Sequence, residues 1–157
     1  MSRLFAPLTR FYQSSIGKKI LVALTGLILV GFVLGHMIGN LLVFAGPEAI
    51  NEYGHMLQTA GHGALIWVAR LGLLAAVLIH IVCTLQLARA NRAARPASYG
   101  KEDTNCATLA SRVMVWTGLT ILVFIIYHLL HFTARTGNDY DTYTTLVNGH
   151  EAHDVYR

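Results

Sequence analysis

Three long apolar stretches dominate this sequence, and each of them contains histidine. Each is long enough to cross the hydrocarbon core of a bilayer as an α-helix, which takes about 20 residues. The expected spans and their histidines are 20–44 with His36, 64–88 with His80, and 110–133 with His128 and His131. An ionisable side chain inside a span is costly without a partner. Histidine in each of three spans therefore indicates a shared ligand.

The composition indicates a polytopic membrane protein. Of the 157 residues, 54% are hydrophobic and only 13% are charged, a balance typical of membrane proteins and not of soluble domains. The net charge of +4 does not indicate nucleic acid, because the basic residues flank the spans. We expect an all-α fold: one membrane domain of three transmembrane helices, followed by a polar tail at 135–157.

The basic residues also predict an orientation. Most of them lie before the first span or between the second and the third: Arg3, Arg10, Lys18, Lys19, Arg89, Arg92, Arg95, Lys101 and Arg112. Because cytoplasmic segments carry an excess of lysine and arginine, we expect the N-terminus in the cytoplasm and the tail outside.

Haem is the cofactor that helix bundles commonly hold by histidine. Cys83 and Cys106 follow no CxxC or CxxCH spacing, so covalent haem, an iron–sulfur cluster and a zinc knuckle are not expected. We expect a b-type haem with histidine on both faces of the iron, which transfers electrons and has no open site. The alternative for each histidine is a hydrogen-bonded structural residue.

Two further features bear on the same site. Gly31, Gly35 and Gly39 fall on one helical face, and they form either a helix-packing seam or, at Gly35, room for a porphyrin beside His36. Arg70 lies near the start of the second span. It either extends to the membrane surface or meets a haem propionate, which we favour.

The segments outside the spans carry ionisable groups with no assigned role. The connection at 47–63 has apolar residues at helical spacing and predicts a short interfacial helix. Its ionisable residues and the two histidines of the tail are expected to be solvated: Glu48, Glu52, His55, His62, His150 and His153.

The sequence also resembles a known family, the cytochrome b membrane anchors of succinate dehydrogenase and fumarate reductase that carry two haems in five helices. The resemblance rests on GLILVGFVLGHMIGNLLVF, EYGHMLQ, ARLGLLAAVLIHIVCTLQLARANRAARP and SRVMVWTGLTILVFIIYHLLHFT. It implies the inner (cytoplasmic) membrane of a bacterium. It also implies flavoprotein and iron–sulfur subunits on the cytoplasmic side, and electron transfer to menaquinone or another quinone. Members of this family continue with two more spans and a fourth histidine, which further sequence or another chain would supply here.

The depth of each histidine predicts which of them share a haem. Measured along the helices from the nearest cytoplasmic basic residue, His36 and His128 lie roughly 24 to 25 Å deep and His80 roughly 13 Å. We therefore expect His36 and His128 on one haem, and His80 on a second haem with a histidine from outside this sequence. His128 is favoured over His131 because the family's ligand follows an aromatic residue, here Tyr127.

Two alternatives to this function stay open. One is the cytochrome b subunit of a hydrogenase or formate dehydrogenase. The other is a haem-free structural or assembly protein of the membrane.

Overall fold

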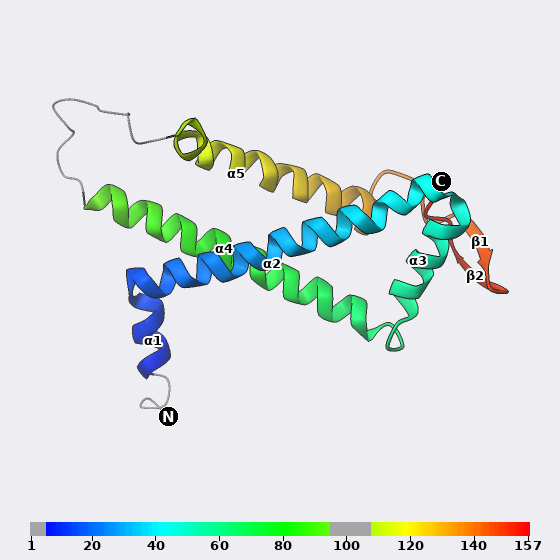
Figure 1. Cartoon of the computed structure of the whole chain (residues 1–157), viewed down its shortest axis with the longest axis horizontal. Helices are drawn as coiled ribbons and strands as arrows, with labels where there is room; N and C mark the ends of the chain where they lie inside the picture. Colours follow the sequence, from blue (N-terminus) through cyan, green and yellow to red (C-terminus); the bar gives the residue numbers. More distant parts are fainter. Residues whose placement is uncertain (1–5, 95–107) are drawn as a thin grey trace. The chain divides into compact units, whose positions relative to one another are not determined.

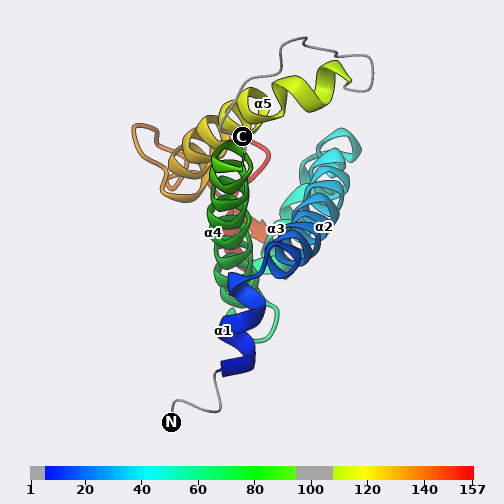
Figure 2. The same cartoon turned by 90° about the vertical axis from the view of Figure 1, so that its left-hand side faces the viewer.

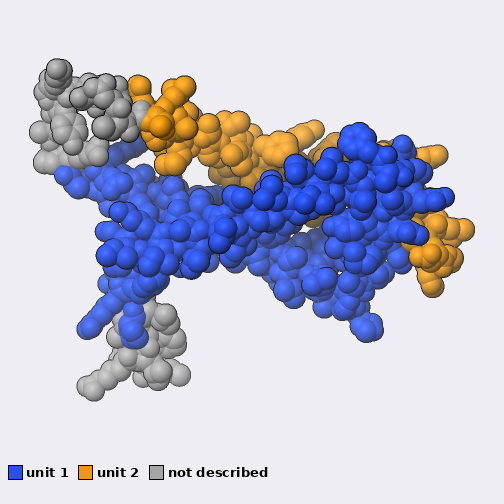
Figure 3. All heavy atoms as spheres, viewed as in Figure 1, with its two compact units in different colours: residues 1–96, 156 blue, residues 97–155, 157 orange. Residues whose placement is uncertain are grey.

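The structure is a computed structural model that describes residues 6–94 and 108–157. The described residues divide into two compact units (Figure 3). The first unit comprises 6–94 together with Tyr156, and the second comprises 108–155 together with Arg157. Part of the segment between the second and third predicted spans, including Cys106, lies outside the described residues, as does the start of the basic N-terminal segment.

The first unit contains four α-helices and a short 3-10 turn (Figure 1). They are α1 (Ala6–Gln13), α2 (Ser15–Asn40), η1 (Leu41–Ala45), α3 (Pro47–Thr59) and α4 (Ala64–Ala93). Ser14 caps α2, because its side-chain oxygen accepts a hydrogen bond from the Gly17 backbone N–H at 2.9 Å. Gly46 has φ 109°, which suits glycine, and Pro47 follows in the first turn of α3, where its missing N–H is no loss. The predicted short helix in 47–63 is confirmed.

Helices α2 and α4 run antiparallel and cross near their midpoints (Figures 1 and 2). The buried residues at and near this packing are small: Thr25 on α2, and Ala76 and Cys83 on α4. Small side chains let two helices approach closely. Cys83 is only 1% exposed, so it acts as a small packing residue at this contact.

The prediction of three apolar helices long enough to cross a membrane is confirmed. They cover Ser15–Ala45, Ala64–Ala93 and Leu109–Thr133. The first begins before the predicted span and the second ends after it. The added residues include Lys18, Lys19, Arg89 and Arg92, which favour helix although they are too polar for the hydrocarbon core.

The second unit begins with α5 (Leu109–His128) and the π turn η2 (Leu129–Thr133). Thr108 caps α5 by accepting a hydrogen bond from the Ser111 backbone N–H at 3.3 Å. The turn is closed by a bond from the Ala134 N–H to the Leu129 carbonyl at 2.8 Å, five residues back, as in a π-helix.

The tail departs from the predicted all-α fold. Strands β1 (Thr144–Val147) and β2 (His150–His153) form an antiparallel hairpin. Asn148 and Gly149 connect them with φ of 51° and 82°. An Asn-Gly pair adopts these angles readily, and it is the strongest short-range hairpin signal in a sequence. Residues 135–157 are polar, and a polar composition by itself predicts an exposed tail without strands.

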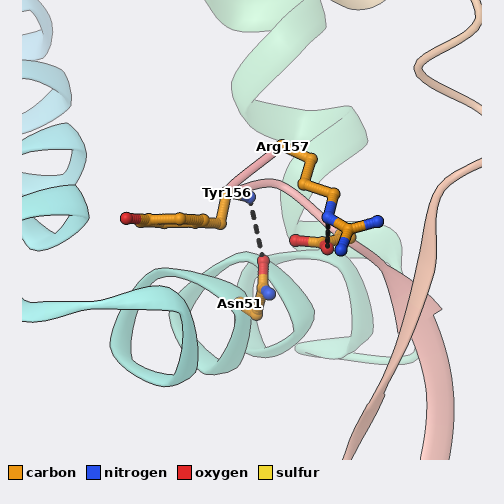
Figure 4. Close-up of polar contacts among 4 residues, drawn as sticks. Asn51, Tyr156 and Arg157 are labelled. Carbon is orange, nitrogen blue, oxygen red and sulfur yellow. Dashed lines mark hydrogen bonds and ion pairs between the residues drawn. The ribbon is translucent and has the colours of Figure 1, made fainter.

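Tyr156 is the one residue from the end of the chain that belongs to the first unit. Its backbone N–H donates a hydrogen bond to Oδ1 of Asn51 on α3, at 3.2 Å (Figure 4). Asn51 is 4% exposed. A buried amide needs such a partner, so this bond satisfies a polar group of α3.

Candidate functional site

His80 lies near the middle of α4, in its contact with α2. The imidazole is half-buried, and its Nδ1 lies 3.0 Å from the Thr25 hydroxyl of α2. The partner that a histidine inside an apolar helix requires is therefore a side chain of the neighbouring helix.

The Thr25 hydroxyl also contacts its own helix. Its Oγ1 lies 2.7 Å from the Leu21 carbonyl and 3.2 Å from that of Val22. A hydroxyl has a single hydrogen, and a carbonyl oxygen can only accept. That hydrogen therefore points to Leu21, and the hydroxyl oxygen accepts a hydrogen bond from the Nδ1–H of His80.

In a neutral ring, this arrangement leaves Nε2 of His80 with its lone pair. Within 6–94 and 108–157 no group forms a hydrogen bond to that nitrogen. A neutral imidazole that donates from one nitrogen and offers the other is the usual form of a metal-ligating histidine.

Gly26 allows this close contact. A Cβ atom at Gly26 would lie 3.3 Å from Cε1 of the His80 ring, closer than side chains normally pack. Thr25 makes the hydrogen bond to the His80 ring and Gly26 leaves room for that ring. Two consecutive residues of α2 therefore contact the same imidazole.

His36 lies on the surface of α2, near its C-terminal end. Its ring stacks on Phe32, with 5.3 Å between the ring centroids. Asn40 donates from Nδ2 to the His36 carbonyl at 2.7 Å, and the same nitrogen lies 3.4 Å from each ring nitrogen. The imidazole is thus held between a phenyl ring and an amide of its own helix.

The three glycines beside His36 differ in their surroundings. A Cβ at Gly39 would lie 2.7 Å from the Tyr53 ring, so Gly39 packs against α3. A Cβ at Gly31 or Gly35 would meet no atom within 4 Å among the described residues. Among the described residues, helix packing therefore explains the glycine at position 39, whereas at Gly31 and Gly35 no described side chain covers the backbone of α2.

His36 and His80 are not brought together. His80 contacts α2 at Thr25, and His36 follows three turns later on the same helix. At about 1.5 Å per residue, that is roughly 16 Å along the axis. This axial offset agrees with the expectation that His36 and His80 lie at different depths in the membrane. The pairing of His36 with His128 joins the two units and stays a prediction.

His128 and His131 have different neighbours. The His128 ring lies between Phe124 and Phe132, with centroid distances of 5.7 and 5.0 Å. The His131 ring stacks on Tyr127 at 5.5 Å, and its Nε2 lies 3.2 Å from the Tyr140 hydroxyl.

The tail thus engages His131, and Asn138 adds to this contact. Its Nδ2 donates to the His131 carbonyl at 2.8 Å and lies 3.5 Å from Nδ1. Both ring nitrogens of His131 lie near tail side chains. The choice of His128 as the ligand stays a prediction.

Arg70 is exposed on α4. Its guanidinium lies over the Trp67 ring, 5.2 Å from the centroid, a cation–π contact one turn away on the same helix. A haem propionate as its partner stays a prediction.

The tail contains one perturbed titratable group and one histidine that differs from expectation. The Tyr143 hydroxyl donates to the Asp139 carboxylate at 3.0 Å, and this hydrogen bond and the nearby negative charge raise the pKa of Tyr143. His150 is exposed as expected, but His153 is half-buried. Its Nε2 lies 3.5 Å from Nη1 of Arg135.

The sequence identified the histidines but missed Thr25 and Gly26. No local pattern marks them, because they lie 55 and 54 residues from His80 and become neighbours only when α2 and α4 cross. Among the described residues, no group of three or more His, Cys, Asp or Glu is arranged to hold a metal ion. Comparison of the chain with protein-family models, curated proteins and solved structures finds no match.

Proposed function

We propose that this chain is the haem b-carrying membrane anchor of a succinate:quinone oxidoreductase, either a succinate dehydrogenase or a fumarate reductase. It would transfer electrons between an iron–sulfur subunit and a membrane quinone, menaquinone by preference. The dicarboxylate would react on the flavoprotein subunit. The location proposed is the bacterial cytoplasmic membrane, with the N-terminus in the cytoplasm.

The observation that carries the proposal is the His80–Thr25 contact. A histidine with a purely structural role would satisfy both ring nitrogens, or expose one to water. His80 instead has Nδ1 bound to Thr25 and Nε2 available at mid-helix, where water is scarce in a membrane. That arrangement fits an iron ligand.

The other residues fit a porphyrin in simpler ways. Gly31 and Gly35 leave open space on the face of α2 that leads to His36. His128 has aromatic rings on either side, which suit an apolar macrocycle. Bound haem would supply one-electron transfer, and histidine side chains of this chain would hold it. The chain's own residues would hold the macrocycle, exclude water and orient the imidazoles.

The decisive experiment is a spectrum of the membrane-purified complex that contains the full chain. We expect a reduced-minus-oxidised spectrum of b-type haem. His80→Ala should lose one haem, because the variant lacks the imidazole that would hold it, while the apolar residues around position 80 still direct membrane insertion. The matched control is His62→Ala, in the exposed turn between α3 and α4, which should keep the full haem content. A colourless wild-type complex, or an unchanged spectrum in His80→Ala, would refute the proposal.

Co-purifying subunits distinguish the proposed complex from a hydrogenase or formate dehydrogenase. A flavoprotein and an iron–sulfur protein with succinate-dependent quinone reduction support the proposal. A nickel- or molybdenum-containing partner contradicts it. Further membrane helices in the purified complex would identify the source of the second ligand for the His80 haem.

A further inference from the structure

We infer that Thr25 is a positioning residue that fixes the tautomer of His80 and so makes Nε2 the ligating nitrogen. The inference rests on the proposed function, in which His80 is a haem ligand. Thr25 acts only through His80.

The oxygen–oxygen distance decides the direction of the hydrogen bond. If the Thr25 hydroxyl donated to Nδ1, its Oγ1 would lie 2.7 Å from the Leu21 carbonyl oxygen with no hydrogen between them. Two lone-pair-bearing oxygens repel at that distance. With the hydrogen directed at Leu21, the two shortest contacts of the hydroxyl, to the Leu21 carbonyl and to Nδ1 of His80, each have one donor and one acceptor. His80 must then carry its proton on Nδ1.

The hydroxyl is also held in place. Threonine is β-branched, and inside a helix its oxygen bonds the carbonyl three or four residues back. Here both the Leu21 and the Val22 carbonyls lie within reach, and the residue is 6% exposed. The acceptor oxygen therefore faces α4 in a single rotamer.

Gly26 leaves room for the ring on another side. A Cβ atom at that position would lie only 3.3 Å from Cε1 of His80. A flipped ring would exchange Nδ1 for a carbon atom and lose the hydrogen bond to Thr25. The hydrogen bond therefore favours one orientation of the imidazole.

The hydrogen bond to Thr25 also changes the basicity of the His80 imidazole, and so its properties as an iron ligand. Donation from Nδ1–H makes Nε2 more basic, and a more basic ligand stabilises ferric over ferrous iron. The Thr25 hydroxyl therefore lowers the reduction potential of the His80 haem and strengthens its binding. Loss of such an outer partner typically weakens metal binding by about 10- to 100-fold.

The test compares three variants in the purified complex by redox titration of the haem absorbance and by haem content. Thr25→Val keeps the shape and removes the hydroxyl, whereas Thr25→Ser keeps the hydroxyl. Thr120→Val is the matched control, because Thr120 bonds its own helix at the Trp116 carbonyl, 3.0 Å away, with no histidine contact among the described residues.

We expect Thr25→Val to favour the ferrous state of one haem by about tenfold, which is about 59 mV upward for a one-electron couple. The second haem should keep its potential. Thr25→Ser and Thr120→Val should match wild type. Loss of one haem in Thr25→Val, with both haems retained in Thr25→Ser, supports the inference equally.

Failure of the inference is distinct from failure of the proposed function. Haem present in wild type, with the same potentials in Thr25→Val, overturns the role of Thr25 alone. So does a Thr25→Ser variant that behaves like Thr25→Val, since packing and not the hydroxyl would then matter. Absence of haem from the wild-type complex overturns both.

Discussion

At the scale of single residues, three histidines of the apolar helices each lie close to a polar side chain. His80 contacts Thr25, His131 contacts Tyr140, and His36 contacts Asn40 of its own helix. The donors and acceptors are hydroxyls and amides, so these contacts add no net charge to the spans. That is the least costly way to keep imidazoles at membrane depth.

Two glycines of the apolar helices offer a test of the His80 contact. Gly26→Ala should displace the His80 ring, because the new Cβ would lie 3.3 Å from Cε1. We expect a shifted spectrum and weaker retention of the His80 haem. Gly72→Ala adds the same methyl group to α4 but meets no described atom within 4 Å.

The measurement is haem content and the reduced-minus-oxidised spectrum of each complex. Alanine favours helix over glycine by about 1 kcal/mol at either position, so the comparison isolates the packing effect. Equal spectra for Gly26→Ala and wild type would show that the ring does not depend on this space.

At the scale of elements, the second unit joins a helix end to a folded tail. The π turn η2 contains His131, and Asn138 and Tyr140 of the tail bond to that residue. The hairpin follows within a few residues. An element that looked in the sequence like a solvated extension is therefore attached to the end of α5 by specific contacts.

The contact of Tyr143 with Asp139 gives a pH-dependent prediction for the tail. The raised pKa of Tyr143 means that the folded tail favours the neutral phenol. The contact is therefore fully present below the usual tyrosine pKa and is lost as the pH rises through the folded value. Asp139→Ala should lower the pKa of Tyr143 toward its usual range, because it removes both the hydrogen bond and the negative charge.

The measurement is an ultraviolet absorbance titration of phenolate, compared between variant and wild type. Asp141→Ala is the control, since Asp141 is a nearby exposed carboxylate that makes no contribution to the Tyr143 pKa. An identical titration for Asp139→Ala and wild type would contradict the contact.

At the scale of the whole molecule, the sequence predicts the spans well and the contacts between them poorly. Length and hydropathy determine where α2, α4 and α5 lie, because a bilayer demands long apolar helices. The position at which α2 crosses α4 depends on side-chain packing between residues far apart in the sequence, and so Thr25 and Gly26 had no local signal. The hairpin does have a local sequence signal, the pair Asn148 and Gly149, but a hydropathy pattern does not detect turns of this kind.

The orientation of the spans is tested by cysteine labelling with a membrane-impermeant thiol reagent. In a Cys106→Ser background, we expect Ser98→Cys to react only from the cytoplasmic side, because basic residues surround it. Glu151→Cys, at an exposed position of β2, should react only from the outside. Native Cys83 is buried and should stay unlabelled. Reaction of Ser98→Cys from the outside would reverse the predicted topology.

The π turn has a last consequence, for how α5 tolerates a change in its length. A π step spans one residue more than an α step, so deletion of one residue within Leu129–Thr133 can restore ordinary helical spacing without a break. Deletion of one residue between Phe124 and His128 would instead rotate every later side chain by about 100°, and would separate the faces of these two residues. A one-residue deletion should therefore be tolerated better within η2 than between Phe124 and His128.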